Sequence, residues 1–306
     1  MDTSRPFRHA DLIASGAFTR HHVVDGRFTS LFPGVSVGRD TVVTMAVRAA
    51  GAALLHPRAV VLGTAAAALW GSPDDPLDVT VDLAVGPGGR RSCPGVRLHR
   101  LDLPPEELTE HRGGLRSSTP ARAAYDLARW LPRGEAVVAL DALTRRTGLA
   151  PDDVRAVAAA HRGDREVRAV EPVLAWVDPR SPDDEASRRR VRLLARGLPV
   201  PVVEQRLLDT DGGLVARLAL AWPEARVGLG GDRDGWARAR AIGWEVIRPG
   251  ARVAADDVVR WVSRAYERWD PEPRLGMPRP LRLPPPPEPD GTCDGGLSRL
   301  VADSRE

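Results

Sequence analysis

The sequence contains no lysine and no asparagine, so all 44 of its basic side chains are arginines. Lysine and asparagine codons are AT-rich, whereas many arginine, alanine, glycine and proline codons are GC-rich. This absence therefore indicates a GC-rich bacterial genome, and the abundance of arginine carries less functional information than it would elsewhere. The 41 acidic residues nearly balance the arginines and leave a formal net charge of +3. Such a balance is compatible with nucleic-acid binding but does not require it.

Cysteine is also scarce, because only Cys93 and Cys293 are present and they lie far apart in the chain. Neither has a second cysteine or a histidine at metal-ligand spacing, so the sequence predicts neither a zinc site nor a disulfide framework. It also lacks any run of about 18 apolar residues, and residues 1–16 contain no continuous apolar segment. We therefore expect a cytoplasmic protein that does not bind a membrane.

The first part of the chain, residues 1–175, is predicted to be an α+β region. Residues 28–37 suit a small hairpin that turns at Pro33-Gly34. The segments 78–85 and 96–101 have the polar–apolar pattern of strands. Helical patterns cover residues 41–55, 64–70, 120–131, 135–146 and 151–161. Thr119 and Pro120 are the residue types that favour the start of the third of these helices.

The second part, residues 181–269, is predicted to form an α/β domain with the order α-β-β-β-α-β-α. An acidic stretch at 181–184 suits the positive end of a helix over residues 187–196. Strands are expected at 200–207, 214–222, 225–229 and 244–247, with helices at 234–242 and 255–269. Residues 270–306 are rich in proline and polar residues, so a disordered tail is expected there.

Several fragments of this second part resemble a known family. The sequence RGLPVPVVEQ at 196–205, LALAWPE at 218–224 and AIGWEVIR at 241–248 are similar to core segments of very-short-patch-repair-type endonuclease domains of actinobacteria. The fragment STPARAAYDLAR at 118–129 resembles a helix that precedes such domains and recurs in AbiEi-like antitoxins of type IV toxin–antitoxin systems. The resemblance covers most of residues 7–269. It implies a restriction-endonuclease-like fold, of the PD-(D/E)xK superfamily, behind an antitoxin-like region.

The acids that this superfamily needs for catalysis are missing from the sequence. Cleavage of a phosphodiester uses Mg²⁺, which is held by one or two carboxylates and generates the attacking hydroxide. The resemblance places these carboxylates at three positions, where this chain has Ala186, Ala219 and Gly230. No catalytic residue and no metal site are therefore expected. The resemblance implies a degenerate nuclease that binds nucleic acid or regulates a process, with DNA or a protein as partner.

An active nuclease that uses relocated acids is the alternative hypothesis, and it would need Mg²⁺ as its only cofactor. The candidate carboxylates are those close to the expected positions in the sequence, Glu185, Glu224, Asp232 and Asp234. This hypothesis requires two or more of them to converge within about 5–6 Å of one point, where they could hold a metal.

Other side chains have both a functional and a structural interpretation. Four arginines, Arg188, Arg189, Arg190 and Arg192, could form a phosphate-binding helix face or an ordinary solvated one. We interpret His9, His21 and His22 as surface histidines. Trp222 and Trp244 are expected to be buried, whereas Trp236 could be buried or stack on bases. Arg122 and Asp126 are expected to form a helix-surface pair worth about 0.3–0.5 kcal/mol.

Overall fold

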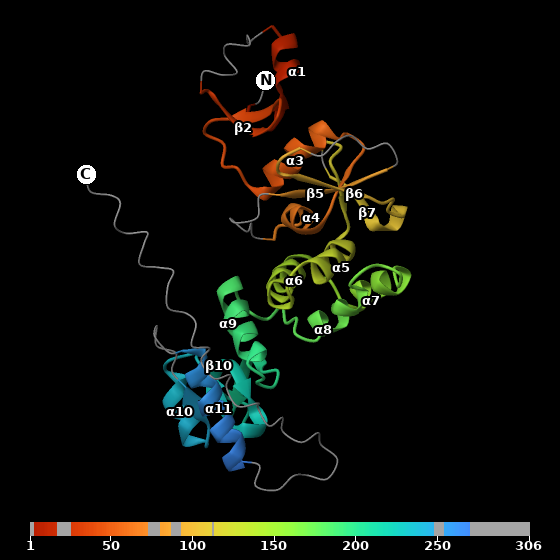
Figure 1. Cartoon of the computed structure of the whole chain (residues 1–306). Helices are drawn as coiled ribbons and strands as arrows, with labels where there is room; N and C mark the ends of the chain where they lie inside the picture. The colour runs from red at the N-terminus through yellow and green to blue at the C-terminus, as the bar shows by residue number, and fades with distance from the viewer. Residues whose placement is uncertain are drawn as a thin grey trace, which may run out of the picture.

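The protein is described from a computed structural model, which covers residues 3–16, 26–72, 80–86, 93–111, 113–247 and 254–269. Three parts follow one another along the molecule in Figure 1: a small N-terminal sheet, a larger middle region, and a C-terminal unit. His21, His22 and residues 270–306, for which a disordered tail was predicted, lie outside the described residues. No helix in the described ranges has the length and apolar character needed to span a bilayer.

The N-terminal part is a three-stranded sheet with the order β1-β3-β2. Its strands are β1 (Phe7–Arg8), β2 (Phe28–Phe32) and β3 (Val35–Gly38), and helix α1 (His9–Ala14) follows the first of them. The predicted hairpin is confirmed, since β2 and β3 pair antiparallel on either side of Pro33-Gly34.

The middle region contains a five-stranded sheet with the order β6-β5-β4-β8-β7. Helices α3 (Met45–Leu55) and α4 (Gly63–Leu69) pack on it and share a core with Val61, Leu83 and Val85. The strands are β4 (Val60–Val61), β5 (Val81–Val85), β6 (Val96–Arg100), β7 (Leu108–Glu110) and β8 (Arg116–Ser118). The prediction found β5 and β6 but missed β4, β7 and β8, which are too short to show a periodic pattern.

Four helices complete the middle region, and the first of them begins where the sequence predicted. They are α5 (Pro120–Trp130), α6 (Arg133–Thr147), α7 (Pro151–Ala160) and α8 (Val170–Leu174). The hydroxyl of Thr119 accepts a hydrogen bond from the backbone N–H of Arg122 at 3.4 Å, as a capping residue does. Helix α6 ends at Gly148, which has the left-handed conformation (φ 69°) that glycine adopts without strain.

The C-terminal unit has the element order predicted from the sequence. Helix α9 (Asp184–Ala195) is followed by β9 (Val202–Leu208), β10 (Leu214–Trp222), the short helix η3 (Pro223–Ala225), β11 (Val227–Leu229), α10 (Gly235–Ala241), β12 (Glu245–Ile247) and α11 (Ala255–Trp269). The sheet has the order β12-β11-β10-β9. Neighbouring strands are antiparallel except β11 and β12, which are parallel. The molecule is therefore a mixed α/β protein with mixed sheets.

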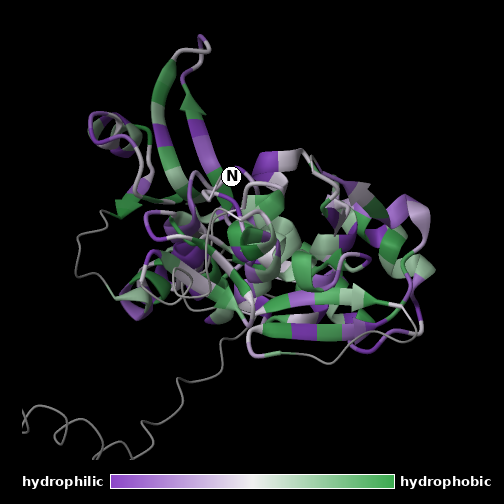
Figure 2. Cartoon of the chain, turned by 90° about the horizontal axis from the view of Figure 1, so that it is seen from above, coloured by the Kyte–Doolittle hydropathy of each residue, from purple (hydrophilic) through white to green (hydrophobic). Residues whose placement is uncertain are grey.

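Two apolar cores lie on opposite faces of the C-terminal sheet. Val203, Leu220 and Trp222 pack with Val262 of α11 and with Leu193 of α9. Leu207 and Leu218 pack instead with Ala239 of α10. Strand residues of the same parity normally face one side of a sheet, and Figure 2 shows the resulting bands of hydrophobic and hydrophilic residues along the strands. In β9 and β10 this alternation is interrupted between residues 203 and 207 and between 218 and 220.

Candidate functional site

The interruption in the C-terminal sheet coincides with two of the positions at which the resemblance to endonuclease domains implied acids. Leu220 pairs with Leu229 and Ala221 with Gly228, and this register continued by one residue puts Ala219 opposite Gly230, just beyond the end of β11. On the other side of β10, Ala219 falls between the pairs Leu218–Gln205 and Leu220–Val203 and therefore faces Glu204. Glu204 has a φ of 54°, a conformation that is uncommon outside glycine and that accounts for the break in alternation.

The backbone after β11 is built around glycine. Gly230 and Gly231 have φ values of 67° and 94°. A Cβ atom on Gly231 would lie 2.0 Å from the carbonyl oxygen of Arg217 and 2.8 Å from the Cα of Leu218. Since both contacts are with backbone of β10, a side chain at residue 231 would force the strands apart. An acid at residue 230 would in turn have to adopt the left-handed region.

The candidate acids Glu185 and Glu224 serve other interactions. Glu185 lies on α9 and forms an ion pair with Arg192 at 3.0 Å. Glu224 lies on η3, before β11, and contacts Tyr266 of α11. Burial raises the pKa of Tyr266 to about 12, and the charge and hydrogen bond of Glu224 add to this shift.

Asp232 and Asp234 lie together in the turn after β11. The backbone N–H of Asp232 donates to the carbonyl of Arg217 at 2.9 Å, and the carboxylate of Asp232 accepts from the N–H of Asp234 at 3.0 Å. Glu224 and this pair are thus at opposite ends of β11. No group of three metal-ligating side chains occurs within the described ranges. The residues present do not fit a magnesium site of the kind that the resemblance implies.

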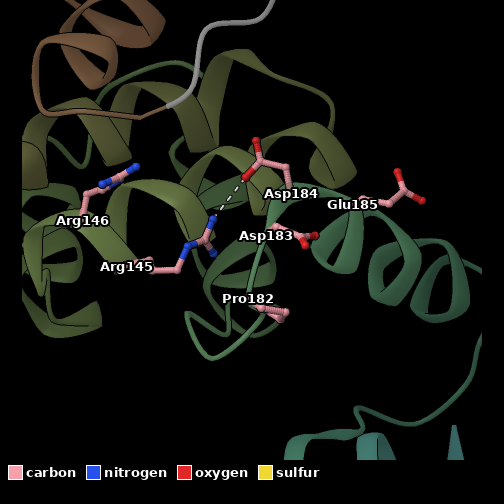
Figure 3. A pocket seen from close by; sticks show the side chains of 6 residues that line it. All are labelled: Arg145, Arg146, Pro182, Asp183, Asp184 and Glu185. Carbon is pink, nitrogen blue, oxygen red and sulfur yellow. Dashed lines mark hydrogen bonds and ion pairs between the residues drawn. The ribbon is translucent and has the colours of Figure 1, made fainter. Parts of the chain in front are cut away.

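A shallow depression of about 640 Å³ lies where α6 meets the first turn of α9. It is lined by Arg145, Arg146, Pro182, Asp183, Asp184 and Glu185. Arg145 pairs with Asp184 at 3.2 Å, and Asp183 caps α9 by accepting from the N–H of Ala186 at 2.8 Å. Figure 3 shows that Glu185 points away from the two arginines. The charges here mainly compensate one another or cap a helix, so the depression has no convergent chemistry.

The four arginines predicted as a phosphate-binding face do not share one environment. Arg188 and Arg189 are exposed, and Arg192 is exposed but paired with Glu185. The prediction for Arg190 was wrong, because its side chain is completely buried. It donates to the carboxylate of Asp141 on α6, and also to the carbonyl of Trp176 and the hydroxyl of Ser181.

This buried ion pair joins the middle region to α9. Asp141 is completely buried as well, and it also accepts a hydrogen bond from the N–H of Asp178 at 2.7 Å. Burial raises the pKa of Asp141, and the guanidinium of Arg190 opposes that shift. Val191 of the same helix packs in the core of the middle region, whereas Leu193 belongs to the core of the C-terminal unit. Helix α9 therefore connects the two cores, and Arg190 has a structural role.

The prediction for Arg122 and Asp126 was also wrong, since both side chains are buried and not on a helix surface. Arg122 donates to Asp126 at 3.1 Å and to Glu107, before β7, at 2.7 Å. The other oxygen of Glu107 lies 2.6 Å from Nε2 of His161, at the end of α7. The i, i+4 spacing identified one partner, but Glu107 and His161 are distant in sequence and gave no signal.

A second polar group that the sequence did not reveal lies on the middle sheet. Asp82 is nearly buried, and its carboxylate lies 2.6 Å from Nε2 of His99. The imidazole of His99 is stacked on Trp130, with ring centroids 4.7 Å apart. An acid that orients a histidine is also found in catalytic triads, but no hydroxyl or thiol nucleophile contacts His99 in the described part of the chain. We interpret this pair as structural.

The remaining aromatic and histidine predictions have mixed outcomes. His9, predicted to lie at the surface, is half-buried, and its Nε2 lies 2.8 Å from the hydroxyl of Ser36. The burial of Trp222 is confirmed, and its indole N–H donates to the carbonyl of Pro199 at 2.9 Å. Trp244 is only half-buried, and Trp236 packs against the same core as Trp244.

Comparison with known proteins identifies relatives without assigning a function. No family model matches the chain. It is 29% identical over 221 residues to Uncharacterized protein MT2308 and to Uncharacterized protein Rv2248, from two strains of Mycobacterium tuberculosis. Each alignment covers 68% of this chain and 78% of the relative. The crystal structure of the RV2827C protein from the same species superposes with a TM-score of 0.38 and 12% identity, over 67% of this chain and 84% of that one.

Proposed function

We propose that the chain is a non-catalytic protein whose C-terminal unit has a restriction-endonuclease-like fold and binds nucleic acid without cutting it. The observation that carries the proposal is that Ala219 and Gly230, which directly adjoin the paired residues Leu220 and Leu229 in register, occupy two positions where acids would hold Mg²⁺. The nearby carboxylates of Glu185, Glu224 and Asp232 belong to different elements and have other partners. A regulatory role is consistent with the antitoxin-like sequence of the upstream region.

The topology of the C-terminal sheet supports the endonuclease-like part of the proposal. Three antiparallel strands followed by a helix and a parallel fourth strand match the order that the sequence fragments imply. Exposed arginines support the proposed nucleic-acid binding, because guanidinium groups form bidentate hydrogen bonds with phosphate oxygens. Arg188 and Arg189 are exposed and form no ion pair within the residues that the structure describes.

The nuclease alternative is tested by incubating the purified full chain with supercoiled plasmid and Mg²⁺ or Mn²⁺. We expect no nicking above that of a preparation carrying the Asp232→Ala substitution. Cleavage that Asp232→Ala or Asp234→Ala abolishes would overturn the non-catalytic proposal and favour relocated acids.

Binding is tested separately, by fluorescence anisotropy with labelled DNA duplex, single-stranded DNA and RNA in a series of salt concentrations. We expect at least one probe to bind with an affinity that falls as salt increases, because phosphate contacts release counterions. Absence of binding to every probe at low salt, or binding that salt does not weaken, would contradict the proposal.

A further inference from the structure

The β9–β10 hairpin carries two arginines directly opposite each other. Arg206 of β9 pairs with Arg217 of β10 in the antiparallel register, and both side chains are exposed. At directly opposed positions, Cβ atoms are about 4.5–5.5 Å apart, and like charges at this spacing destabilise the strand pair. The hairpin thus contains a pair of like charges whose mutual repulsion opposes strand pairing.

Two acids close to this pair, Asp232 and Asp209, do not neutralise it. Asp232 touches Arg217 only through its backbone N–H, since its carboxylate accepts from Asp234. Asp209 caps its own turn by accepting from the N–H groups of Asp211 and Gly213. Neither Arg206 nor Arg217 forms an ion pair inside the described ranges. Other arginines of the unit do have acidic partners, as Arg196 with Asp256, Arg260 with Asp257 and Arg268 with Glu245 show.

The backbone that holds the pair is well fixed. Arg217 lies in the middle of β10, with β9 on one side. On the other side, its carbonyl oxygen accepts the N–H of Asp232, and Gly231 packs directly on it. The two arginines are therefore held at opposed backbone positions of paired strands, and a ligand that binds both does not have to order a loop.

We infer that Arg206 and Arg217 together bind one phosphate group of a nucleic-acid strand, an inference that rests on the proposed function. A phosphodiester offers two anionic oxygens, one for each guanidinium, and its charge offsets the repulsion between them. Phosphates also recur along the strand, so the exposed Arg188 and Arg189 can contact others. This assigns the exposed surface of the β9–β10 hairpin, in addition to α9, to the nucleic-acid interface.

The test compares Arg206→Gln, Arg217→Gln and the double variant with the unmodified full chain, by anisotropy with a labelled DNA duplex across a salt series. Arg264→Gln is the matched control, because Arg264 is an exposed arginine of α11 in the same unit. We expect each single substitution to weaken binding about three- to tenfold and to reduce the salt slope by about 1, the size expected for one lost phosphate contact. The double variant is expected to lose less than the product of the two single effects, because both arginines bind one phosphate.

Urea denaturation of the same variants separates binding from folding. Since the two arginines repel each other, each substitution is expected to leave the denaturation midpoint unchanged or to raise it. A lowered midpoint with unchanged affinity would mean a structural role and would overturn the inference. Wild-type affinity and salt slope in both single variants would also overturn it and would leave the proposed function standing.

Failure of the unmodified chain to bind duplex DNA, single-stranded DNA or RNA would reject the proposed function itself. If a labelled acidic peptide bound more tightly than nucleic acid and the same variants lost this binding, the partner of the two arginines would be a protein and not nucleic acid.

Discussion

The middle region and the C-terminal unit use charged residues in opposite ways. In the middle region Glu107, Arg122, Asp126 and Asp141 are buried and bonded to one another or to α9. In the C-terminal unit after α9, the buried residues within the described ranges are apolar or glycine, and the charged side chains lie outside. The number of arginines alone therefore does not indicate a binding surface, because some arginines are buried in the packing and others face solvent.

This difference teaches where a ligand could bind. A buried guanidinium whose donors are already used by carboxylates has little capacity left for a phosphate. Exposing it would leave those carboxylates buried and unpaired, which is strongly unfavourable. An exposed arginine without an ion-pair partner has its donors available to a ligand. We therefore expect a ligand interface on the C-terminal unit and on the outer face of α9.

The largest expected effect comes from removing a charge of the middle region. Arg122→Met leaves Glu107 and Asp126 buried without their main partner, so we expect the free energy of unfolding to fall by about 3–5 kcal/mol. Arg217→Met, at an exposed position of the C-terminal unit, is the matched variant and is expected to change it by less than about 0.5 kcal/mol. Urea denaturation measures both. Equal effects of the two substitutions would break the comparison.

A smaller effect is expected in the C-terminal unit at the point where its strands are closest. Gly231→Ala introduces a Cβ against the backbone of β10 and at a positive φ, so a loss of about 1–3 kcal/mol is expected. Gly212→Ala is the control, because Gly212 also has a positive φ but a Cβ there would meet nothing within 4 Å. A loss in Gly231→Ala no greater than in the control would show that the strand contact is not tight.

A still smaller difference in unfolding free energy between the two regions is expected from changes at helix N-termini. Thr119→Ala removes the cap of α5 and is expected to lower the free energy of unfolding by about 1 kcal/mol, whereas Thr119→Ser keeps the hydroxyl. Asp234, at the start of α10, makes no side-chain capping bond. Thermal or urea unfolding of Asp234→Ala is therefore expected to show a smaller loss than Thr119→Ala, and the reverse order would contradict this account.

The two tyrosines of the chain offer a pH-dependent comparison, because Tyr125 lies in the middle region and Tyr266 in the C-terminal unit. Burial raises the pKa of both, to about 12 for Tyr266. A raised pKa in the folded state favours the neutral phenol. The stability that each phenol contributes is thus complete below the unfolded value of about 10 and is lost as pH rises through the folded pKa. Tyrosinate absorbance of Tyr125→Phe is expected to report titration of Tyr266 near pH 12. Titration of either tyrosine near pH 10 in the folded protein would contradict the burial described.

Much of the fold could be predicted from local patterns, and the contacts that matter most could not. Helices such as α5 and α11 and the long strand β10 have periodic patterns and clear end signals, so their bounds agree closely with the prediction. The strands β4, β7 and β8 have two or three residues each and depend on pairing with distant segments. The same reason explains the errors at Arg122 and Arg190, whose decisive partners Glu107 and Asp141 are remote in sequence.

The candidate site divides in the same way. The sequence identified Ala219 and Gly230, and the strand register continued by one residue puts them opposite one another, but no pattern indicated that Glu204 would face Ala219 with a positive φ. The opposed pair of Arg206 and Arg217 also depended on strand register. Register is fixed by the turn and by the packing of both faces of the sheet, and a single strand read alone does not contain it.

The two glycines after β11 constrain the evolutionary routes open to this chain. A carboxylate gained at residue 230 alone would meet an unfavourable backbone conformation, and one gained at residue 231 would collide with β10. A gain of metal chemistry at this end of β11 would need both a shift of the loop and at least one further acid. A single substitution at either glycine therefore does not convert the present arrangement into a metal site.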